Sequence, residues 1–418
     1  MFQAPRGTQD ILPEEAPYWT FVEQTARDWA ARYGYGEIRT PTFEDTGLFL
    51  RGVGGSTDIV EKEMYTFQDK GGGELTLRPE GTASIVRAYI EHGLASRPQP
   101  VRLFSFVTCF RYDRPQRGRY REFHQWDCEA LGELDPLVDA ELITLLWRVY
   151  QALGLRGLTL QLNSIGDAQC RPAYLERLRE YYRPLLATVC GDCQRRYQTN
   201  PLRLLDCKNP PCQTAIAGAP RLLDYLCAEC AEHFTALRTY LTDADIPVEL
   251  NPRLVRGLDY YTKTVFEVWP AAAGAQTALG GGGRYDGLAE QLGGRPTPAV
   301  GFATGIERVI LTLKAQGIVP PALPAPRVYV AYLGDAARRA AVRLADRLRQ
   351  RGVPTLVGVG GRSMRAQLRQ ANALGVAWAV LIGDDELARG VVQLKPMAGG
   401  VELALAPEAA VERLAAGG

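Results

Sequence analysis

A proline-rich segment, residues 317–326 (GIVPPALPAP), divides the sequence into two parts with different patterns. Proline fixes its own φ angle and donates no backbone hydrogen bond, so this segment favours an extended linker over a helix or a central strand. Beyond it, apolar runs such as RVYVAYLG and WAVLIGD alternate with helical segments rich in Ala and Arg. This alternation predicts a small α/β domain with a parallel or mixed sheet over residues 327–418.

The longer part before the linker mixes strands and helices. Residues 18–44 indicate an amphipathic helix, a glycine-rich turn and a short strand that ends at Pro41. Short β-like runs and one helix follow up to about residue 132, and strand character returns over residues 247–304. Between them, residues 170–245 are mainly helical and rich in Cys and Arg. We therefore expect an α+β domain with a helical insertion.

Length and charge limit the possible functions. A chain of 418 residues is expected to form two or three domains. Its 48 Lys and Arg residues nearly balance its 47 Asp and Glu residues, so any nucleic-acid surface must be a local patch. The first residues lack the apolar core of a signal peptide, and no apolar run is long enough to span a bilayer. These features predict a soluble, cytoplasmic protein without a membrane partner.

Arginines cluster in the stretch CFRYDRPQRGRYREFHQWDCE, at positions Arg111, Arg114, Arg117, Arg119 and Arg121. Both ends of the stretch read as strand, and a Pro and a Gly lie between them, which predicts a β-hairpin with a positive tip. Arginine forks match the geometry of phosphate groups. Arg111 follows an apolar run and should lie near the floor of such a site. The alternative is a solvated hairpin whose arginines pair with ordinary surface acids.

The outgoing strand of this hairpin has two different faces. Because side chains alternate along a strand, one face carries Arg121, Phe123, Gln125, Asp127 and Glu129. The other face reads as core and carries His124, Trp126, Cys128 and Ala130. Burying the first, polar row without partners is costly, so a polar ligand is a reasonable occupant of that face.

Two further stretches place polar residues near turns. In TLRPEGTASIVRAY, Glu80 and Thr82 stand at a helix start, where they could hold polar ligand atoms or simply cap the helix. In LVRGLDYYTKTVFEVW, Arg256 precedes a turn, and Tyr260 and Tyr261 are expected on opposite faces of the strand that follows. All five side chains are candidates for a binding site.

A cation and a run of glycines mark the end of this region. In GFATGIERVI, Arg308 enters the first turn of a helix, where a cation opposes the helix dipole and needs a compensating interaction. The stretch GGGGRYDG lacks the features of a Walker or dinucleotide-binding loop. It predicts either a close approach of the backbone to a ligand or a glycine-rich β-bulge.

Seven of the nine cysteines lie between residues 170 and 230. Without a secretion signal, disulfides are not expected, and Cys-x-x-Cys pairs suggest metal instead. The candidate zinc ligands are Cys190, Cys193, Cys227 and Cys230, with Cys207 and Cys212 between the two pairs. Buried structural thiols are the alternative, and the sequence leaves the metal content open. Cys109 and Cys128 read as small core residues.

Together these stretches resemble the class II aminoacyl-tRNA synthetases, and specifically the histidyl-tRNA synthetase family. GYGEIRTP, FRYDRPQRGRYREFHQ and VGFATGIERV are similar to the three class motifs, and LVRGLDYYT and GGGGRYDGL to two histidine-specific stretches. The resemblance covers essentially the whole chain. It implies a catalytic domain built on an antiparallel sheet, formed by residues 1–169 and 246–316. It also implies that the insertion at 170–245 clasps the acceptor arm of tRNA and that residues 327–418 bind the anticodon.

The resemblance also implies an activity. A histidine carboxylate would attack ATP to give histidyl-adenylate and pyrophosphate, and the histidyl group would then pass to the 3′ end of the tRNA for histidine. The implied partners are L-histidine, ATP with Mg²⁺, the tRNA and a second copy of the chain in a homodimer. One alternative is a non-catalytic regulatory relative from histidine biosynthesis, which usually lacks the C-terminal domain and LVRGLDYYT. Another is an RNA-binding module without chemistry.

Individual roles follow from the same resemblance. Arg256 and Arg111 would be the catalytic cations beside the α-phosphate. The implied ATP-binding residues are Arg111, Arg114 for the outer phosphates, and Phe123 and Arg308 on either side of the adenine. The implied histidine-binding residues are Glu80, Thr82, Gln125, Glu129, Tyr260 and Tyr261. Asp127 stands where some bacterial members have glycine, which puts the polarity of the histidine pocket in doubt.

Overall fold

The computed structural model describes residues 2–54, 57–271 and 278–416. The chain divides into two compact units, Met1–Pro321 and Ala322–Gly418, and the division falls within the proline-rich segment 317–326.

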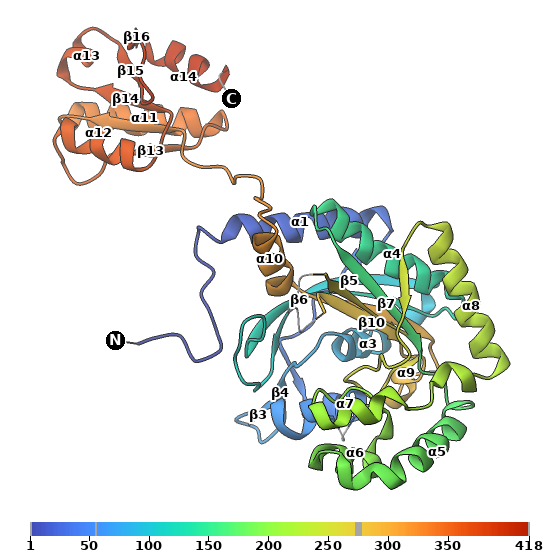
Figure 1. Cartoon of the computed structure of the whole chain (residues 1–418). Coiled ribbons are helices and arrows are strands. Elements are labelled where there is room, and N and C mark those ends of the chain that lie inside the picture. The colour runs from blue at the N-terminus through green and yellow to red at the C-terminus, as the bar shows by residue number, and fades with distance from the viewer. Residues whose placement is uncertain (1, 55–56, 272–277, 417–418) are drawn as a thin grey trace. The chain divides into compact units, whose positions relative to one another are not determined.

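The first unit is built on an eight-stranded sheet (Figure 1). In sheet order its strands are β1 (Gly36–Glu37), β5 (Val101–Phe110), β6 (Glu122–Leu131), β11 (Ala299–Gly305), β10 (Gly280–Arg284), β9 (Thr262–Pro270), β7 (Leu158–Ser164) and β8 (Val248–Leu250). The six central strands pair antiparallel, and only the outer pairs β1–β5 and β7–β8 are parallel. The expected antiparallel catalytic sheet is therefore confirmed. A small separate sheet contains β2 (Phe43–Asp45), β4 (Glu74–Leu77) and β3 (Tyr65–Gln68).

One face of the large sheet packs against helices α1 (Ala16–Arg32), α4 (Pro136–Ala152) and α10 (Ile306–Ala315) (Figure 1). In α1 the buried residues Trp19, Val22, Ala26 and Ala30 recur at helical spacing and form one apolar stripe. From β6, this core receives Trp126, Cys128 and Ala130, as the strand alternation predicted. The opposite face of β6 is thus left for polar side chains.

That opposite face is covered by α3 (Thr82–Glu91), α9 (Leu288–Gln291) and residues 174–222 of the insertion, which share a second apolar core. The last helix of the insertion, α8 (Ala228–Asp243), packs instead against α4 and contributes Phe234, Leu237 and Leu241 to the first core. Helix α2 (Thr46–Gly52) and the π-helical turn Ile59–Glu63 lie close to α3. Residues 170–245 are helical as predicted: they form α5 (Arg171–Tyr182), α6 (Gly191–Thr199), α7 (Pro210–Ala217), α8 (Ala228–Asp243) and the 3₁₀ turns Arg183–Thr188, Pro201–Leu204 and Leu222–Tyr225. Another 3₁₀ turn, Leu94–Ser96, follows α3.

The glycine-rich stretch forms strand β10 at the centre of the sheet. Its pairing with β9 becomes irregular between Gly283 and Arg284, where the partner passes from Val265 to Thr262. The extra residues belong to β9, so the prediction of a bulge within the glycines is not confirmed. Neighbouring strands leave no space for side chains here: a Cβ added to Gly282 would lie 1.9 Å from the Gly301 carbonyl oxygen. The glycines are therefore required by close strand packing.

This packing makes a strong prediction for Gly282→Ala. The added methyl group would have to displace the backbone of β11, so we expect a loss of about 3 kcal/mol, the upper end of the usual cost of overpacking. Thermal unfolding followed by circular dichroism should show a clearly lower Tm. Gly287→Ala is the matched control, because its Cβ would meet no heavy atom closer than 3.8 Å. Equal Tm values for the two variants would contradict the packing argument.

The second unit has a five-stranded sheet with helices on both faces. In sheet order the strands are β13 (Thr355–Val357), β12 (Val328–Tyr332), β14 (Trp378–Ile382), β15 (Val392–Pro396) and β16 (Leu403–Leu405). The first three are parallel and the last two antiparallel. Its helices are α11 (Asp335–Gln350), α12 (Met364–Ala373), α13 (Asp384–Ala388) and α14 (Pro407–Ala416). The predicted mixed α/β domain is confirmed. Among the described residues, the helices are all too short or too polar to cross a membrane.

Candidate active site

A cavity of about 440 Å³ opens between the hairpin loop after β5, the ends of β9–β11 and the turn that carries Arg256. Five of the predicted site residues line it, namely Arg111, Phe123, Gln125, Arg256 and Arg308. They come from distant parts of the sequence, and the antiparallel pairing of β6 with β5 and β11 brings them together. The structure thus gathers three of the four predicted ATP-binding residues, Arg111, Phe123 and Arg308, around one space, together with Arg256 and Gln125.

The arginine-rich hairpin positions its arginines unequally. Strands β5 and β6 pair from Val101–Leu131 to Phe110–Glu122, so residues 111–121 form the connecting loop. Arg111 Nε donates a hydrogen bond to the Pro79 carbonyl oxygen at 2.8 Å, and its guanidinium lies 5.3 Å from the centre of the Phe123 ring. Arg119 also lines the cavity, whereas Arg114 is exposed outside it. A loop has no side-chain period, so the sequence could not rank these arginines.

Arg308 occupies the first turn of α10, as predicted. Its Nε donates to the Gly118 carbonyl oxygen at 3.0 Å and its Nη1 to that of Ala278 at 3.1 Å. These carbonyl groups supply the compensation that a cation needs at a helix start. Burial lowers the pKa of Arg308, and repulsion from Arg119 and Arg111 lowers it further. Converging cations of this kind are suited to a polyanionic ligand.

Behind the cavity, the same face of β6 carries a buried acidic cluster. Thr82 Oγ1 donates to Glu129 Oε1 at 2.7 Å. The Glu80 carboxylate accepts the backbone N–H groups of Thr82 at 2.8 Å and Ala83 at 2.9 Å. Glu80 therefore caps free N–H groups at the start of α3. The capping prediction is wrong for the Thr82 hydroxyl, because Gly81 is the N-cap of α3 and the hydroxyl donates to Glu129 instead.

The two tyrosines do not alternate across a strand, so that prediction is wrong. Tyr260 and Tyr261 lie in the turn before β9, which begins only at Thr262, and their ring centres are 4.7 Å apart. Lys263 has φ +47, which further interrupts the extended conformation. The Arg256 guanidinium lies 5.6 Å from the centre of the Tyr261 ring and so connects the acidic cluster to the cavity.

Sequence reasoning missed two partners of the predicted residues. Tyr285 is fully buried and its hydroxyl donates to Glu129 Oε2. Glu267 on β9 forms an ion pair with Arg256 and lines the cavity. Glu267 is the only carboxylate in the apolar run TVFEVW, a signal that could have identified it. Tyr285 follows the glycine stretch and gave no separate signal.

The acidic cluster holds its protons unusually tightly. Burial raises the pKa of Glu129 to about 8, although the hydrogen bonds from Thr82 and Tyr285 act in the opposite direction. Burial also raises the pKa of Asp127 well above its usual range, with further contributions from the Glu129 and Glu80 charges. Neither carboxylate oxygen of Asp127 has a hydrogen-bond partner among the described residues. The cluster is therefore suited to a cationic or hydrogen-bond-donating ligand.

Small residues make the space for these acids. On β11, Gly301 pairs with Glu129, Ala303 with Asp127 and Gly305 with Gln125. A Cβ on Gly301 would lie 1.5 Å from Glu129 Oε2, so only glycine leaves this carboxylate in place. The site is thus a row of polar side chains on β6 that lies beside a row of small residues on the neighbouring strand β11.

Comparisons with known proteins agree with this architecture. A family model described as "Histidyl-tRNA synthetase" matches residues 7–178 and 199–309, and one described as "Anticodon binding domain" matches residues 327–416. The histidine–tRNA ligase of Dehalococcoides mccartyi strain 195 is 56% identical over 95% of both chains, and that of Desulforamulus reducens is 50% identical over 95% of this chain and 94% of that one. The crystal structure of apo Staphylococcus aureus histidyl-tRNA synthetase superposes with a TM-score of 0.84 at 40% identity, covering 99% of this chain and 100% of that one. The chain belongs to the histidyl-tRNA synthetase family.

Proposed function

We propose that this chain is a histidine–tRNA ligase, which activates L-histidine with ATP and transfers the histidyl group to its tRNA. The observation that carries the proposal is the placement of two chemically different groups of side chains beside each other. An arginine-lined cavity with an aromatic wall lies next to a buried cluster of carboxylates and tyrosines, and the guanidinium of Arg256, which lines the cavity, lies 5.6 Å from the centre of the Tyr261 ring. The cavity suits a nucleoside triphosphate, and the buried cluster suits an amino acid with an ammonium and an imidazole group.

ATP would occupy the cavity. Phe123 and Arg308 would lie on opposite sides of the adenine. Stacking and cation–π contacts bind the faces of the ring and do not depend on which base it is. Arg111 and Arg256 would contact the α-phosphate, while Arg119 and the exposed Arg114 would be available for the outer phosphates. Mg²⁺ would accompany ATP as its counter-ion and reduce the negative charge of the phosphates. The cavity offers Mg²⁺ hard oxygen ligands, for example on Glu267 and Glu307.

L-Histidine would occupy the acidic cluster. Glu80, Thr82 and Gln125 would accept hydrogen bonds from the α-ammonium group, and Glu129 and Tyr261 would bind the imidazole. The hydrogen bonds from Thr82 and Tyr285 hold the Glu129 carboxylate in one orientation. Tyr260 would close the pocket, since its ring lies 5.6 Å from that of Tyr285. Asp127 would add a second acid beside the pocket.

The chemistry then requires positioning and charge neutralisation. A carboxylate oxygen of histidine attacks the α-phosphorus, the bond to the β-phosphate oxygen breaks, and pyrophosphate leaves. In the second step a terminal ribose hydroxyl of tRNA attacks the activated carbonyl carbon, and AMP leaves. Arg111 and Arg256 would stabilise the charge that develops on the α-phosphate, the largest contribution that fixed cations make to such reactions.

The remaining parts of the chain would serve tRNA binding and assembly. We assign residues 1–169 and 246–316 to catalysis, the insertion 170–245 to the acceptor arm, and residues 327–418, after the linker 317–326, to the anticodon. Arg195 and Lys208 are exposed basic residues of the insertion that suit phosphate contacts. We place this activity in the cytoplasm.

We further propose that the chain works as a homodimer. The first class motif lies next to β2, where the exposed Phe43 ring lies 6.3 Å from the exposed Phe67 ring of β3. Exposed aromatic pairs of this kind are typical of interfaces. Sedimentation equilibrium should give twice the chain mass at micromolar concentration. A monomer under conditions that support activity would contradict this assignment.

The function is tested by histidine-dependent exchange between ATP and pyrophosphate. Purified protein with Mg²⁺ is assayed with each of the twenty amino acids separately, and exchange is expected with histidine alone. Exchange with another amino acid would mean that Glu129 and Tyr261 do not select imidazole. A folded protein that gives no exchange would support the regulatory relative instead, and tRNA binding without adenylate formation would support the RNA-binding module.

A further inference from the structure

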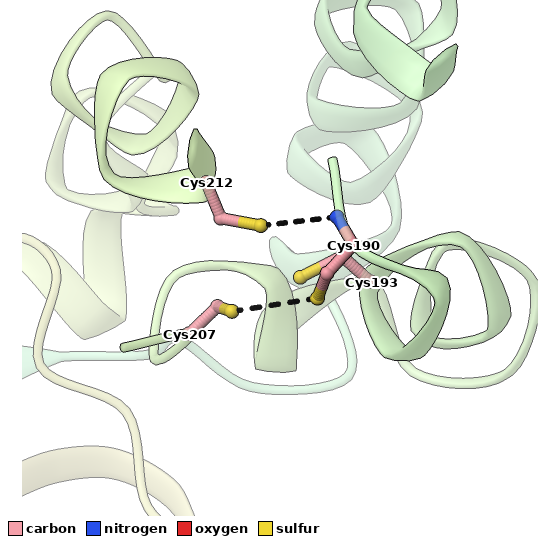
Figure 2. Close-up of side chains that lie close together, drawn as sticks. All are labelled: Cys190, Cys193, Cys207 and Cys212. Carbon is pink, nitrogen blue, oxygen red and sulfur yellow. Dashed lines mark hydrogen bonds between the residues drawn. The ribbon is translucent and has the colours of Figure 1, made fainter. Parts of the chain in front are cut away.

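We propose that the insertion binds a structural zinc ion through Cys190, Cys193, Cys207 and Cys212. The sequence showed two Cys-x-x-Cys pairs but not which residues join them. The structure separates the pairs. Cys190 and Cys193 converge with Cys207 and Cys212 (Figure 2), whereas Cys227 and Cys230 belong to a different group. The metal content is independent of the ligase function, and only the link between the metal and the ATP cavity rests on that proposed function.

The sulfur positions fit a tetrahedral ion. All four Sγ atoms lie within 4.8 Å of one another, and Cys190 Sγ is 3.8 Å from Cys207 Sγ. Zn–S bonds of about 2.3 Å at tetrahedral angles place neighbouring sulfurs about 3.8 Å apart. A disulfide would require about 2.05 Å, and all nine cysteines are free. The spacing is thus that of a shared ion.

The backbone around these sulfurs also has the arrangement of a ligand centre. Cys190 is the N-cap of α6, so it lies at the positive end of the helix dipole, and its backbone N–H donates to Cys212 Sγ at 3.2 Å. Cys193, Cys207 and Cys212 are buried. Burial alone would suit small core residues. It does not explain why four sulfurs from α6, the loop after the turn Pro201–Leu204, and α7 point at one centre (Figure 2).

Zinc at this place would hold a wall of the ATP cavity. Between Cys193 and Cys207 the chain carries Arg203, which lines the cavity and donates from Nη1 to the Arg256 carbonyl oxygen at 3.4 Å. Asn200 in the same segment donates to Asp259 Oδ1 at 2.7 Å. The metal would therefore fix both ends of the segment that holds the backbone beside the catalytic arginine.

A second group of possible metal ligands is supported by contacts of its own. We infer a second zinc site formed by Asp167, Cys170, Cys227 and Cys230, whose ligand atoms also lie within 4.8 Å of one another. Cys170 Sγ is 3.8 Å from Cys230 Sγ, and Cys170 Sγ accepts the backbone N–H of Asp167 at 3.3 Å. Cys170 and Cys227 are the N-caps of α5 and α8, so the starts of two helices meet at this group. Three sulfurs and one carboxylate oxygen form a closed set of ligands for zinc.

Zinc content tests both sites on the full-length chain. Protein produced with zinc in the medium should contain two zinc ions per chain by mass spectrometry. C190S/C193S should lose the first ion and keep the second, and C227S/C230S should do the reverse. Cys109→Ala is the control, because this buried thiol lies outside both groups. Folded wild-type protein without zinc would overturn both sites. A single ion that only C227S/C230S removes would overturn the four-cysteine site, and one that only C190S/C193S removes would overturn the second.

Cobalt keeps the proposal testable if the variants fail to fold. Wild-type protein refolded with Co²⁺ should show the charge-transfer bands of cobalt thiolate and the intense visible bands of tetrahedral coordination. Wild-type protein that takes up Co²⁺ without thiolate bands would overturn the proposal. Metal-depleted protein should also show a rise of about tenfold in KM for ATP, because the segment around Arg203 loses its anchor. An unchanged KM would overturn the proposed link between the metal and the cavity wall.

Discussion

Arg256→Gln is expected to lower kcat for histidine-dependent pyrophosphate exchange by about 10²–10³-fold. The guanidinium lines the cavity and lies 5.6 Å from the Tyr261 ring centre, and in the proposed complex it would contact the α-phosphate and the histidine carboxylate. Because negative charge develops on the α-phosphate only as the reaction proceeds, the loss should fall on kcat more than on KM for ATP. Steady-state exchange at saturating ATP and histidine measures it directly.

Two controls separate chemistry from structure for this variant. Arg253→Gln changes an exposed arginine on the same turn, outside the cavity lining, and should leave kcat unchanged. Arg256→Gln also leaves Glu267 without its cationic partner, so the double variant R256Q/E267Q removes both charges. If kcat recovers in the double variant, the unpaired Glu267 caused the loss and the catalytic role of Arg256 is wrong. If it stays low, the guanidinium itself is required.

Glu129→Gln is expected to lower kcat/KM for histidine by about 10²–10³-fold, the cost of removing one partner from a buried, charged hydrogen bond. With a pKa of about 8, Glu129 in the unliganded protein is largely protonated at neutral pH, and a bound cation or N–H donor favours its ionised form. The amide keeps the size of the side chain but cannot ionise in this way. KM for ATP should change little, since Glu129 lies behind the cavity rather than in its lining. Glu122→Gln, on the same strand but outside the cavity lining, is the matched control.

The same substitution should have the opposite effect on stability at alkaline pH. The pKa of Glu129 is about 8 in the folded chain, against an ordinary value of 4.5, so the folded state keeps a proton that the unfolded state has released. Wild-type stability therefore falls as pH rises from 4.5 towards 8, by about 1.4 kcal/mol per pH unit from this group. Glutamine is neutral throughout and removes this dependence.

Urea unfolding at several pH values checks the sign. The free energy of unfolding of Glu129→Gln minus that of the wild type should increase steadily between pH 6 and pH 8. A difference that does not vary with pH would mean that Glu129 is ionised in the folded protein, and the electrostatic description of the pocket would be wrong. Weaker histidine use combined with greater stability also excludes misfolding as the cause of lost activity.

The sequence was most informative where a periodic pattern or a charge cluster was strong. Strand alternation from Phe123 to Glu129 correctly separated the apolar side chains Trp126 and Cys128 from a polar face, since side chains in a strand have only two directions, although His124 is only partly buried. The proline-rich segment and the α/β pattern beyond it predicted the second unit. These features depend on local geometry alone, so they can be predicted from the sequence without the tertiary structure.

Features that depend on tertiary packing could not be predicted in this way. Tyr260 and Tyr261 read as part of a strand, but a turn and the left-handed conformation of Lys263 bring their rings together. Tyr285 reaches Glu129 only because β10 and β6 lie on either side of β11. The cysteines were visible as pairs, yet their division into two groups depends on how the helices of the insertion fold back.

The glycine strand β10 also determines how freely this protein can vary. A Cβ at each of its four glycines would come within 2.6 Å of another atom: the Tyr150 hydroxyl for Gly280, and the carbonyl oxygens of Phe266, Gly301 and Thr264 for the next three. In a saturation-mutagenesis library, these chemically plain positions should be as intolerant as the arginines that carry charge. Exposed Arg117, at the hairpin tip, should accept many replacements. New substrate preferences can therefore evolve only through the side chains around β10, because the four glycines of this strand cannot be replaced.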